Sequence, residues 1–565
     1  MTPPQPTQAN DPRTDPFRWS RADTATAFAH FSDPDHPSQR QYASQHGIPR
    51  ATLGYWLRQQ APDDLDADLV AFLRCPAGER LLRRIVLAAL LVLQQQGSCG
   101  LRPIGQFLRL ARLDPFVATS YGALHGLAAA VQTDLGLFGE EEHPRLAERM
   151  TPRTVTLAAD ENFHGQHPCL VAIEPVSNFL LAECYREHRD GDTWTEAIRH
   201  GLRGLPVEVV LLTSDEARGL LRCARDGLEV PHSPDLFHRQ RDLLKPVLLP
   251  LARSIRQAEK ELEKATGHLD SLDGELPADG SVQMSVKEIG QIAQAIRHEE
   301  AAQSRLEEAQ RHKEELLEQV RGLGDDYHPF DRHTGRPLTA EQLARRLEQR
   351  HKGVERVVEQ ADLSECASAA VAKSRSCLGA LVAVVAWFWS LSRRRVEELE
   401  LSEEAERLVY ESLLPGLYWE AAARRGRAAE ERKRLKEMAE RLQQEAWQGR
   451  GALASLPEER REEVRRVAQE CAGLFSRSSS CVEGRNGRLS LHHHGQGRLR
   501  EGKLKALTVV HNYVIRRADG TTAAERFFGV KHRDVFAWLL ERLPELPRSA
   551  AKRPKTAGHA APEEG

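Results

Sequence analysis

Three acidic residues occupy positions from which they could bind divalent cations together. Asp160 follows the apolar run Val155 to Ala159, and Asp215 follows the apolar run at 207–213. Such runs are typical of strands covered on both faces, and ligands bind where strands of an open sheet end. Glu483 is the third acid. Carboxylates are hard oxygen ligands, and two divalent cations about 4 Å apart can activate a nucleophile and neutralise a leaving oxygen in phosphodiester cleavage.

The segment around Glu483 is basic. Residues 476–505 contain seven Lys or Arg and two acids. If Glu483 begins a helix, Asn486 shares its face at i+3. An acid that binds metal while its neighbours hold phosphates needs this composition, although an acid among cations can also simply neutralise them. We take Arg485, Asn486 and Arg488 as candidate DNA contacts.

The acids require a sheet to position them, and the chain contains one set of predicted strands. The strands alternate with helices in the order β-β-β-α-β-α-β, which is that of a ribonuclease-H-like fold. Asp160 and Asp215 end two of these strands, whereas Glu161 should face away from Asp160, because successive strand side chains point to opposite faces. The predicted strands are 155–159, 169–174, 179–185, 207–213 and a short fifth strand near 229–232.

A long helical insertion follows the strands. It comprises residues 236–475. Residues 236–320 are charged and partly heptad-like, and the loop LPADGS at 276–281 divides two helices as the turn of a helical hairpin would. The apolar run Ser376 to Leu391 is shorter than the roughly 20 residues that a spanning helix needs, so we expect a buried core helix. The charge runs are most simply solvated helix faces.

A helix-turn-helix is predicted near the N-terminus, at residues 38–60. Ser38 is a good N-cap, Gly47 supplies the turn, and the second helix would bury one apolar face. Arg50, Thr52 and Arg58 lie largely elsewhere on that helix and are candidate major-groove or phosphate contacts. The alternative is a helical hairpin that only packs.

Bulk composition excludes little. The net charge of −3 conceals local patches, and the nine cysteines lack the paired spacing of a zinc ribbon or a disulfide framework. The N-terminus lacks the order of a signal peptide, so the protein is expected to be soluble and cytoplasmic, with no membrane partner. The predicted regions are 1–20, disordered; 21–62, helix-turn-helix; 63–150, helical, a candidate second DNA-binding module; 151–235, first part of the core; 236–475, helical insertion; 476–547, core completion with the catalytic Glu; and 548–565, disordered tail.

Several words of the sequence resemble bacterial insertion-sequence transposases of the DDE type, including those with a helical insertion before the last acid. They are LAADENFHG, TSDEARGLLRC, HSPDLFHRQRDL, SSSCVEGRNGRLSL and NYVIRRADGTTAAERFFG. The resemblance covers roughly residues 38–545. It implies Asp160, Asp215 and Glu483 as catalytic metal ligands, with two Mg²⁺ or Mn²⁺ ions. The insertion would account for the 268 residues between Asp215 and Glu483.

The resemblance implies an enzyme that cuts double-stranded DNA at element ends and joins the 3′ end to target DNA, as a homodimer or higher oligomer. Asp235 and His238 match a word of the family, and either a role near the site or a structural role stays open. Other readings are an inactive or domesticated transposase acting as a DNA-binding protein, a nuclease without strand transfer, and a coiled-coil scaffold. A scaffold leaves the acids and their basic surroundings unexplained.

Overall fold

The computed structural model describes residues 19–58, 67–274, 285–426, 428–449, 451–493 and 498–549. The chain divides into two compact units. The central unit is Met150–Ser490, and the terminal unit comprises Met1–Arg149 with Leu491–Gly565. Most of the two segments predicted to be disordered lies outside the described residues, although Ser20 caps the first helix.

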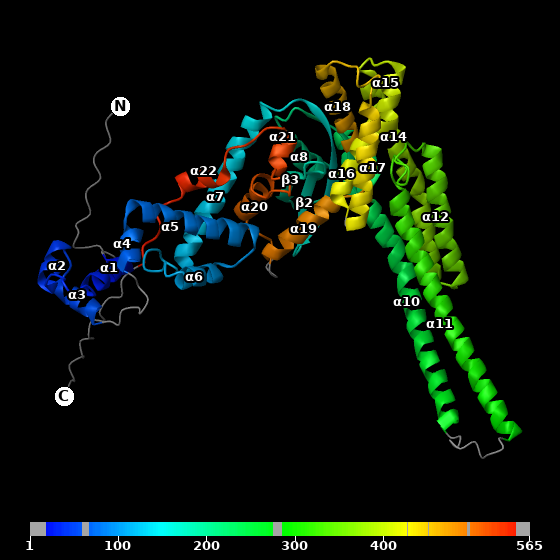
Figure 1. The fold of residues 1–565 in the computed structure, drawn as a ribbon, viewed down its shortest axis with the longest axis horizontal. Coiled ribbons are helices and arrows are strands. Elements are labelled where there is room, and N and C mark those ends of the chain that lie inside the picture. Colours follow the sequence, from blue (N-terminus) through cyan, green and yellow to red (C-terminus); the bar gives the residue numbers. More distant parts are fainter. Residues whose placement is uncertain are drawn as a thin grey trace. The chain divides into compact units, whose positions relative to one another are not determined.

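The central unit contains a five-stranded sheet, from which the helices of the insertion extend to one side (Figure 1). Its strands lie in the order β3-β2-β1-β4-β5, with β1–β2 and β2–β3 antiparallel and β1–β4 and β4–β5 parallel. The predicted sequence of strands and helices is therefore present. The strands are β1 (Arg153–His164), β2 (His167–Glu174), β3 (Phe179–Tyr185), β4 (Val207–Ser214) and β5 (His232–Pro234).

Strand β1 is longer than its apolar run predicts. It continues past Asp160 to His164, because residues 158–164 pair with β2 in an antiparallel hairpin. The parallel pairing with β4 ends at Ala158 opposite Thr213. Asp160 therefore lies within β1 but beyond the end of its contact with β4.

Short helices connect the later strands. Helix α8 (Gly191–Leu202) packs against β2 and β3 through Trp194, Ala197 and Ile198, which are buried. Helix α9 (Arg218–Arg222) continues as a π-helical turn, Cys223–Leu228, before β5. Because β4 and β5 are parallel, these connecting elements bring the C-terminal ends of both strands to the same end of the sheet.

The insertion begins with the predicted helical hairpin. Helices α10 (Leu236–Gly274) and α11 (Val286–Asp326) run side by side (Figure 1), and the loop between them lies outside the described residues. In α11, Ala295, Ala302 and Ala309 are buried at intervals of seven, the spacing of a heptad seam. Helices α12 (Ala340–Gln360) and α13 (Glu365–Ser376) pack along the hairpin.

A second group of helices completes the insertion. The predicted apolar helix is present in α14, although it is buried on one face only, at positions such as Val384, Val385 and Phe388. Its outward positions include Ala380 and Ala383, so 22% of the most apolar stretch is buried. Among the described residues, Glu365–Glu397 is the one helical stretch long and apolar enough to cross a membrane. The helices are α14 (Leu378–Glu397), α15 (Glu403–Leu408) with the π-helical turn Val409–Leu413, α16 (Leu414–Arg425), α17 (Ala429–Trp447) and α18 (Glu458–Gly473).

The insertion and the sheet share one hydrophobic core. Leu211 of β4 belongs to the same buried cluster as Leu236, Phe388 and Phe475. Helix α14 packs against β5, and α18 packs against β1. The insertion is therefore built onto the sheet rather than tethered to it.

The C-terminal region differs from the prediction for 476–547. Helix α19 (Ser480–His493) reaches Ser490 within the central unit, but residues 491–547 belong to the terminal unit. There α20 packs against α7, and buried Glu142 of α7 binds the backbone and side chain of Arg533. These apolar and ionic contacts draw the segment to α7. The helices of this unit are α1 (Arg21–Phe31), α2 (Gln39–Gln45), α3 (Arg50–Leu57), α4 (Ala67–Arg74), α5 (Pro76–Ala88) with the π-helical Ala89–Gln96, α6 (Leu101–Leu110), α7 (Tyr121–Ala147), α20 (Glu501–Tyr513), α21 (Ala523–Phe528) and α22 (Val535–Arg542).

Candidate active site

Asp160 and Asp215 lie where the parallel pairing between β1 and β4 ends. The last paired residues are Ala158 and Thr213, and each acid comes two residues after one of them. Neighbouring strands are about 4.8 Å apart, so the two carboxylates come from adjacent positions. Burial, followed by the negative charge of Asp215, raises the pKa of Asp160 to about 7. The structure therefore holds two acids whose charges repel each other across a partly buried edge.

The two ends of the insertion meet beside these acids. The amide of Leu236, at the start of α10, donates to the carbonyl of Arg477 at 3.1 Å. The amide of Ser479 donates to Asp235 Oδ2 at 2.9 Å, and the Ser479 hydroxyl donates to the same oxygen. The chain leaves the sheet and returns to it at one point. This closure brings Glu483 to the sheet in spite of its distance from Asp215 in the sequence.

Asp235 is the residue that joins the two ends. Its Oδ1 accepts the amide of Phe237 at 2.7 Å, which caps α10, and its side chain is buried. Burial alone would raise its pKa, but hydrogen bonds from His238 and Ser479 hold the pKa of Asp235 below its ordinary value. Both oxygens are occupied by donors of the protein itself. The geometry therefore favours a structural role for Asp235 next to the site.

His238 lies between two carboxylates. Its Nδ1 is 3.0 Å from Asp235 Oδ2, and its Nε2 is 3.6 Å from Glu483 Oε1. The hydrogen bond to Asp235 raises the pKa of His238; burial opposes the rise, and the charges of Asp235 and Asp160 add to it. The sequence signal for this residue is the i, i+3 pair Asp235 and His238 at a strand-to-helix junction, whose role the sequence left open.

Glu483 stands in the first turn of α19, so the condition under which Asn486 follows it by one turn on a helix is met. Its side chain is about a third exposed (34%) and faces His238. Asn486, one turn later, is half-buried, and its side-chain oxygen is buried without a hydrogen-bond partner among the described residues. Arg488 is exposed, so it remains available to a ligand.

Arg485 differs from its predicted role as a DNA contact. It is buried, and its Nε and Nη2 atoms each donate to Glu183 of β3 at 2.6 Å. This two-pronged ion pair fastens α19 to the sheet. Sequence reasoning placed Arg485 with the exposed cations because its partner lies 302 residues away.

Glu161, the neighbour of Asp160 in β1, has an ion-pair partner of its own. It forms an ion pair with Arg189, and its Oε2 atom is buried without a hydrogen-bond partner in the described part of the chain. Burial raises the pKa of Glu161 despite the opposing bond to Arg189. The Asp215 charge acts on Glu161 as well as on Asp160, which places Asp215 near both.

The donor chemistry at Asp160 and Asp215 suits a divalent cation. Two hard oxygen donors repel each other there, and a cation would remove that repulsion. Within the described residues, however, no group of three or more His, Cys, Asp or Glu side chains is arranged to hold a metal ion. Glu483 is turned toward His238. The pair Asp160 and Asp215 therefore has the donor chemistry of a metal site, whereas Glu483 contacts His238 instead.

The predicted helix-turn-helix residues lie in the terminal unit. Ser38 caps α2 with a capping box, Gly47 has φ 59°, and Leu53 and Trp56 of α3 are buried. Helix α1 adds a third helix, since it packs against α3 and shares its core. On α3 and just after it, Arg50 and Arg58 are exposed and Thr52 is half-buried.

Comparison with known proteins adds one partial match. Residues 409–555 match a family described only as a family of unknown function, DUF6399. The match includes Glu483 but neither Asp160 nor Asp215. No curated protein matches the chain, and no solved structure matches it.

Proposed function

We propose that this protein is a DDE-type DNA transposase that acts in the cytoplasm, with a ribonuclease-H-like core that is completed by α19. The observation that carries the proposal is the joining of the insertion's two ends at Asp235 and Ser479, next to the acids. A 268-residue separation between Asp215 and Glu483 is otherwise hard to reconcile with one site. The contacts of Asp235 and Leu236 with Ser479 and Arg477 remove that difficulty, because the insertion begins and ends at the same place beside the sheet.

Each residue then has a role in phosphodiester cleavage and joining. Asp160 and Asp215 would hold divalent cations, Mg²⁺ or Mn²⁺, which supply nucleophile activation and neutralise the leaving oxygen. Glu483 would add the third carboxylate once its side chain turns from His238. His238, fixed by Asp235, would orient Glu483. Exposed Arg488 would contact a phosphate of the bound strand.

The test removes the charge of each acid while keeping its size. Asp160→Asn, Asp215→Asn and Glu483→Gln should each abolish nicking of supercoiled plasmid and joining of a pre-cut 3′ end in Mg²⁺ or Mn²⁺. DNA affinity should survive, because the acids repel phosphate. The matched control is Asp192→Asn, whose side chain is 80% exposed on α8 and which should keep full activity.

Cleavage by the unmodified protein in excess chelator would refute the metal mechanism. Full activity of Glu483→Gln, with loss of activity in the two Asp variants, would show that Glu483 is not the third catalytic acid. Cleavage without joining would make the protein a nuclease, and DNA binding without either reaction would favour a regulator.

DNA recognition is assigned to the three-helix segment α1–α3. Replacing Arg50 and Arg58 together by Ala should weaken binding to duplexes from the flanks of the coding segment. The slope of log affinity against log salt should fall by about 2, since each lost phosphate contact releases about 0.9 fewer ions. If a filter-binding titration shows unchanged affinity and an unchanged salt slope, the segment α1–α3 does not bind the DNA through Arg50 and Arg58. The control is Lys433→Ala with Lys436→Ala, which removes two exposed cations of α17.

A further inference from the structure

One face of α10 carries a row of exposed cations. The residues recur at helical spacings of three, four or eight, and each is solvent exposed. From the first to the last, the row extends about 35 Å at 1.5 Å per residue, close to one turn of B-form DNA. Asp242, Glu259 and Glu263 share the face, which therefore keeps an excess of three cations over acids. We call this row the α10 basic face: Arg241, Lys245, Arg253, Arg256, Lys260 and Lys264.

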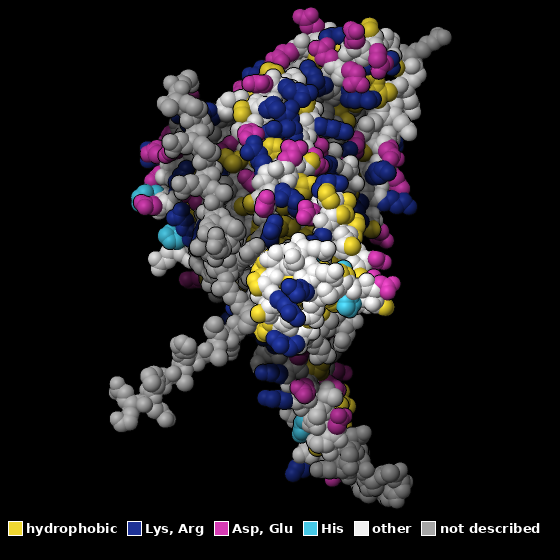
Figure 2. Space-filling view, turned by 90° about the vertical axis from the view of Figure 1, so that its left-hand side faces the viewer, with side chains coloured by type: hydrophobic (Ala, Val, Ile, Leu, Met, Phe, Trp, Pro, Cys, Tyr) yellow, Lys and Arg dark blue, Asp and Glu magenta, His cyan; other side chains and the backbone are white. Residues whose placement is uncertain are grey.

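The cations of the α10 basic face are unpaired. Among the described residues none of the six forms an ion pair, whereas α17 pairs Lys433 with Glu437 and Lys436 with Glu440. Figure 2 shows a face of the molecule on which Lys and Arg are interspersed with acids. Unpaired cations in a row gain no stability from their neighbours and repel one another. Their arrangement is explained by an anionic partner rather than by the fold.

The α10 basic face begins at the candidate active site. Arg241 follows His238 by less than one turn, and its positive charge acts on that histidine. A cavity of about 300 Å³ lies between α10 and α13 at the same level, and Lys245 lines it opposite Lys373 of α13. The row therefore leads outward from the acids along the hairpin. A polyanion that lies on it has one end at the site.

We propose that the α10 basic face binds the backbone of double-stranded DNA and guides that duplex to the carboxylates of Asp160 and Asp215. This inference rests on the proposed function and names a second DNA surface besides α1–α3. Lys and Arg on phosphates give affinity without sequence preference. The duplex is therefore the target DNA or the DNA flanking the cut, rather than the specific end sequence.

The experiment measures binding of full-length protein to a 30-base-pair duplex of arbitrary sequence, with chelator present. The test variant replaces Lys245, Arg253, Arg256 and Lys260 by Gln. The slope of log affinity against log salt should fall by about 3.6, since each of the four lost phosphate contacts contributes about 0.9. The control variant carries the same change of charge at cations that form i,i+4 ion pairs: Arg424, Lys433, Lys436 and Arg466. It should keep the slope of the unmodified protein.

A photo-crosslinking amino acid locates the duplex and guards against an unfolded variant. Placed at Leu249, which is 49% exposed on α10, it should crosslink the duplex. Placed at Glu437 of α17, 63% exposed, it should not. An unchanged slope in the test variant, an equal loss in the control variant, or absence of the Leu249 crosslink would overturn the proposal.

Binding to vesicles of phosphatidylserine that depends on these cations, without duplex binding, would also overturn the proposal. Because the assay contains chelator, it does not depend on cleavage. Full activity of Asp160→Asn would overturn the proposed function and leave this binding result intact, so the two proposals can fail separately.

Discussion

Replacing Asp235 by Ala should release the first turn of α19 from the start of α10. Asp235 accepts the amides of Phe237 at 2.7 Å and Ser479 at 2.9 Å, the Ser479 hydroxyl, and His238 Nδ1 at 3.0 Å. Hydrogen bonds to charged groups contribute roughly 1.5–3 kcal/mol each, and an N-cap about 1 kcal/mol. Because water replaces some of the lost hydrogen bonds, we expect the free energy of local opening to fall by roughly 4 kcal/mol.

Hydrogen exchange measured by mass spectrometry reports this local opening. The peptide containing Glu483 should lose about a thousandfold in protection, since 1.4 kcal/mol corresponds to tenfold. The amides of Val482 and Glu483 both donate to the Ser479 carbonyl, so they report the same turn. Protection in Asp235→Asn should lie between that of the unmodified protein and that of Asp235→Ala. The Asn side-chain oxygen can still cap α10, but its NH2 group cannot accept the two hydrogen bonds from Ser479.

The control is Asp242→Ala, an exposed acid on the same helix, which should leave protection unchanged. Ser479→Ala should cost roughly 1–2 kcal/mol, and its effect should not add to that of Asp235→Ala, since the two residues share a bond. A change below about 0.5 kcal/mol in Asp235→Ala would refute the reasoning. Additive effects of the two substitutions would do the same.

Two further predictions concern buried ion pairs. Arg485→Leu should destabilise the central unit by roughly 3 kcal/mol in thermal denaturation, because it removes the guanidinium that neutralises the buried carboxylate of Glu183. Changing both residues to Leu should restore most of the loss, and an unaltered melting temperature of the single variant would contradict the role of the pair. In the terminal unit, burial would raise the pKa of Glu142, but bonds from Arg145 and Arg533 lower it to about 2. The stabilisation from this carboxylate is present above pH 4.5, the pKa of Glu in the unfolded chain, and is lost as the pH falls toward 2. Glu142→Gln should therefore cost roughly 2 kcal/mol at pH 7 and reduce the loss of stability between pH 4 and 2. Parallel profiles of stability against pH for the two proteins would exclude this linkage.

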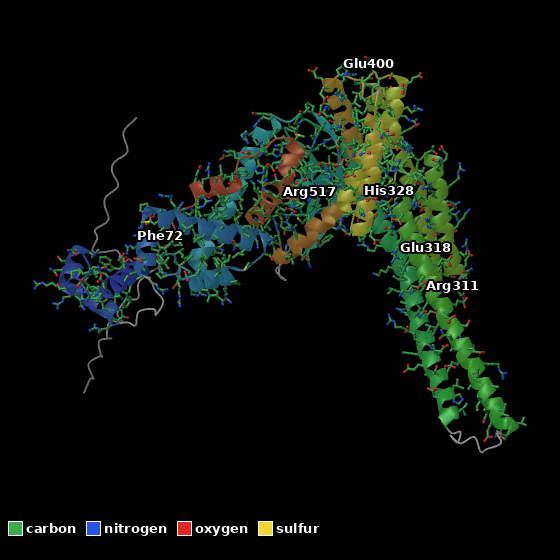
Figure 3. The ribbon with its side chains drawn as sticks, viewed as in Figure 1. Phe72, Arg311, Glu318, His328, Glu400 and Arg517 are labelled. Carbon is green, nitrogen blue, oxygen red and sulfur yellow. The ribbon has the colours of Figure 1, made fainter. Side chains whose placement is uncertain are left out.

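One buried network shows why distant partners escape sequence reasoning. Arg477, just before α19, donates to the carbonyl of Gly324 at 2.7 Å and contacts His328 Nε2 at 2.9 Å. His328, labelled in Figure 3, also contacts the Tyr418 hydroxyl at 2.5 Å. Burial, with the charge of Arg477, lowers the pKa of His328. Two segments of the insertion thus meet the residue that precedes α19, and no local pattern in the sequence brings them together.

The sequence by itself determined the local elements. Apolar runs with strand spacing give β2, β3 and β4, and the capping residue Ser38 begins α2. Asp215 could be placed at a strand end because the apolar run before it stops there. These features depend on backbone sterics and side chains a few residues apart, so a short stretch of sequence contains their causes.

Only the tertiary structure decided what those elements bring together. Glu483 meets His238 because the insertion closes at Asp235, and Arg485 is buried because Glu183 lies opposite it in β3. The extension of β1 past Asp160 depends on its pairing with β2. Each of these outcomes is set by contacts between residues far apart in the chain, whose energies exceed local preference. A carboxylate or guanidinium looks the same in the sequence whether its partner is water or a buried residue hundreds of positions away.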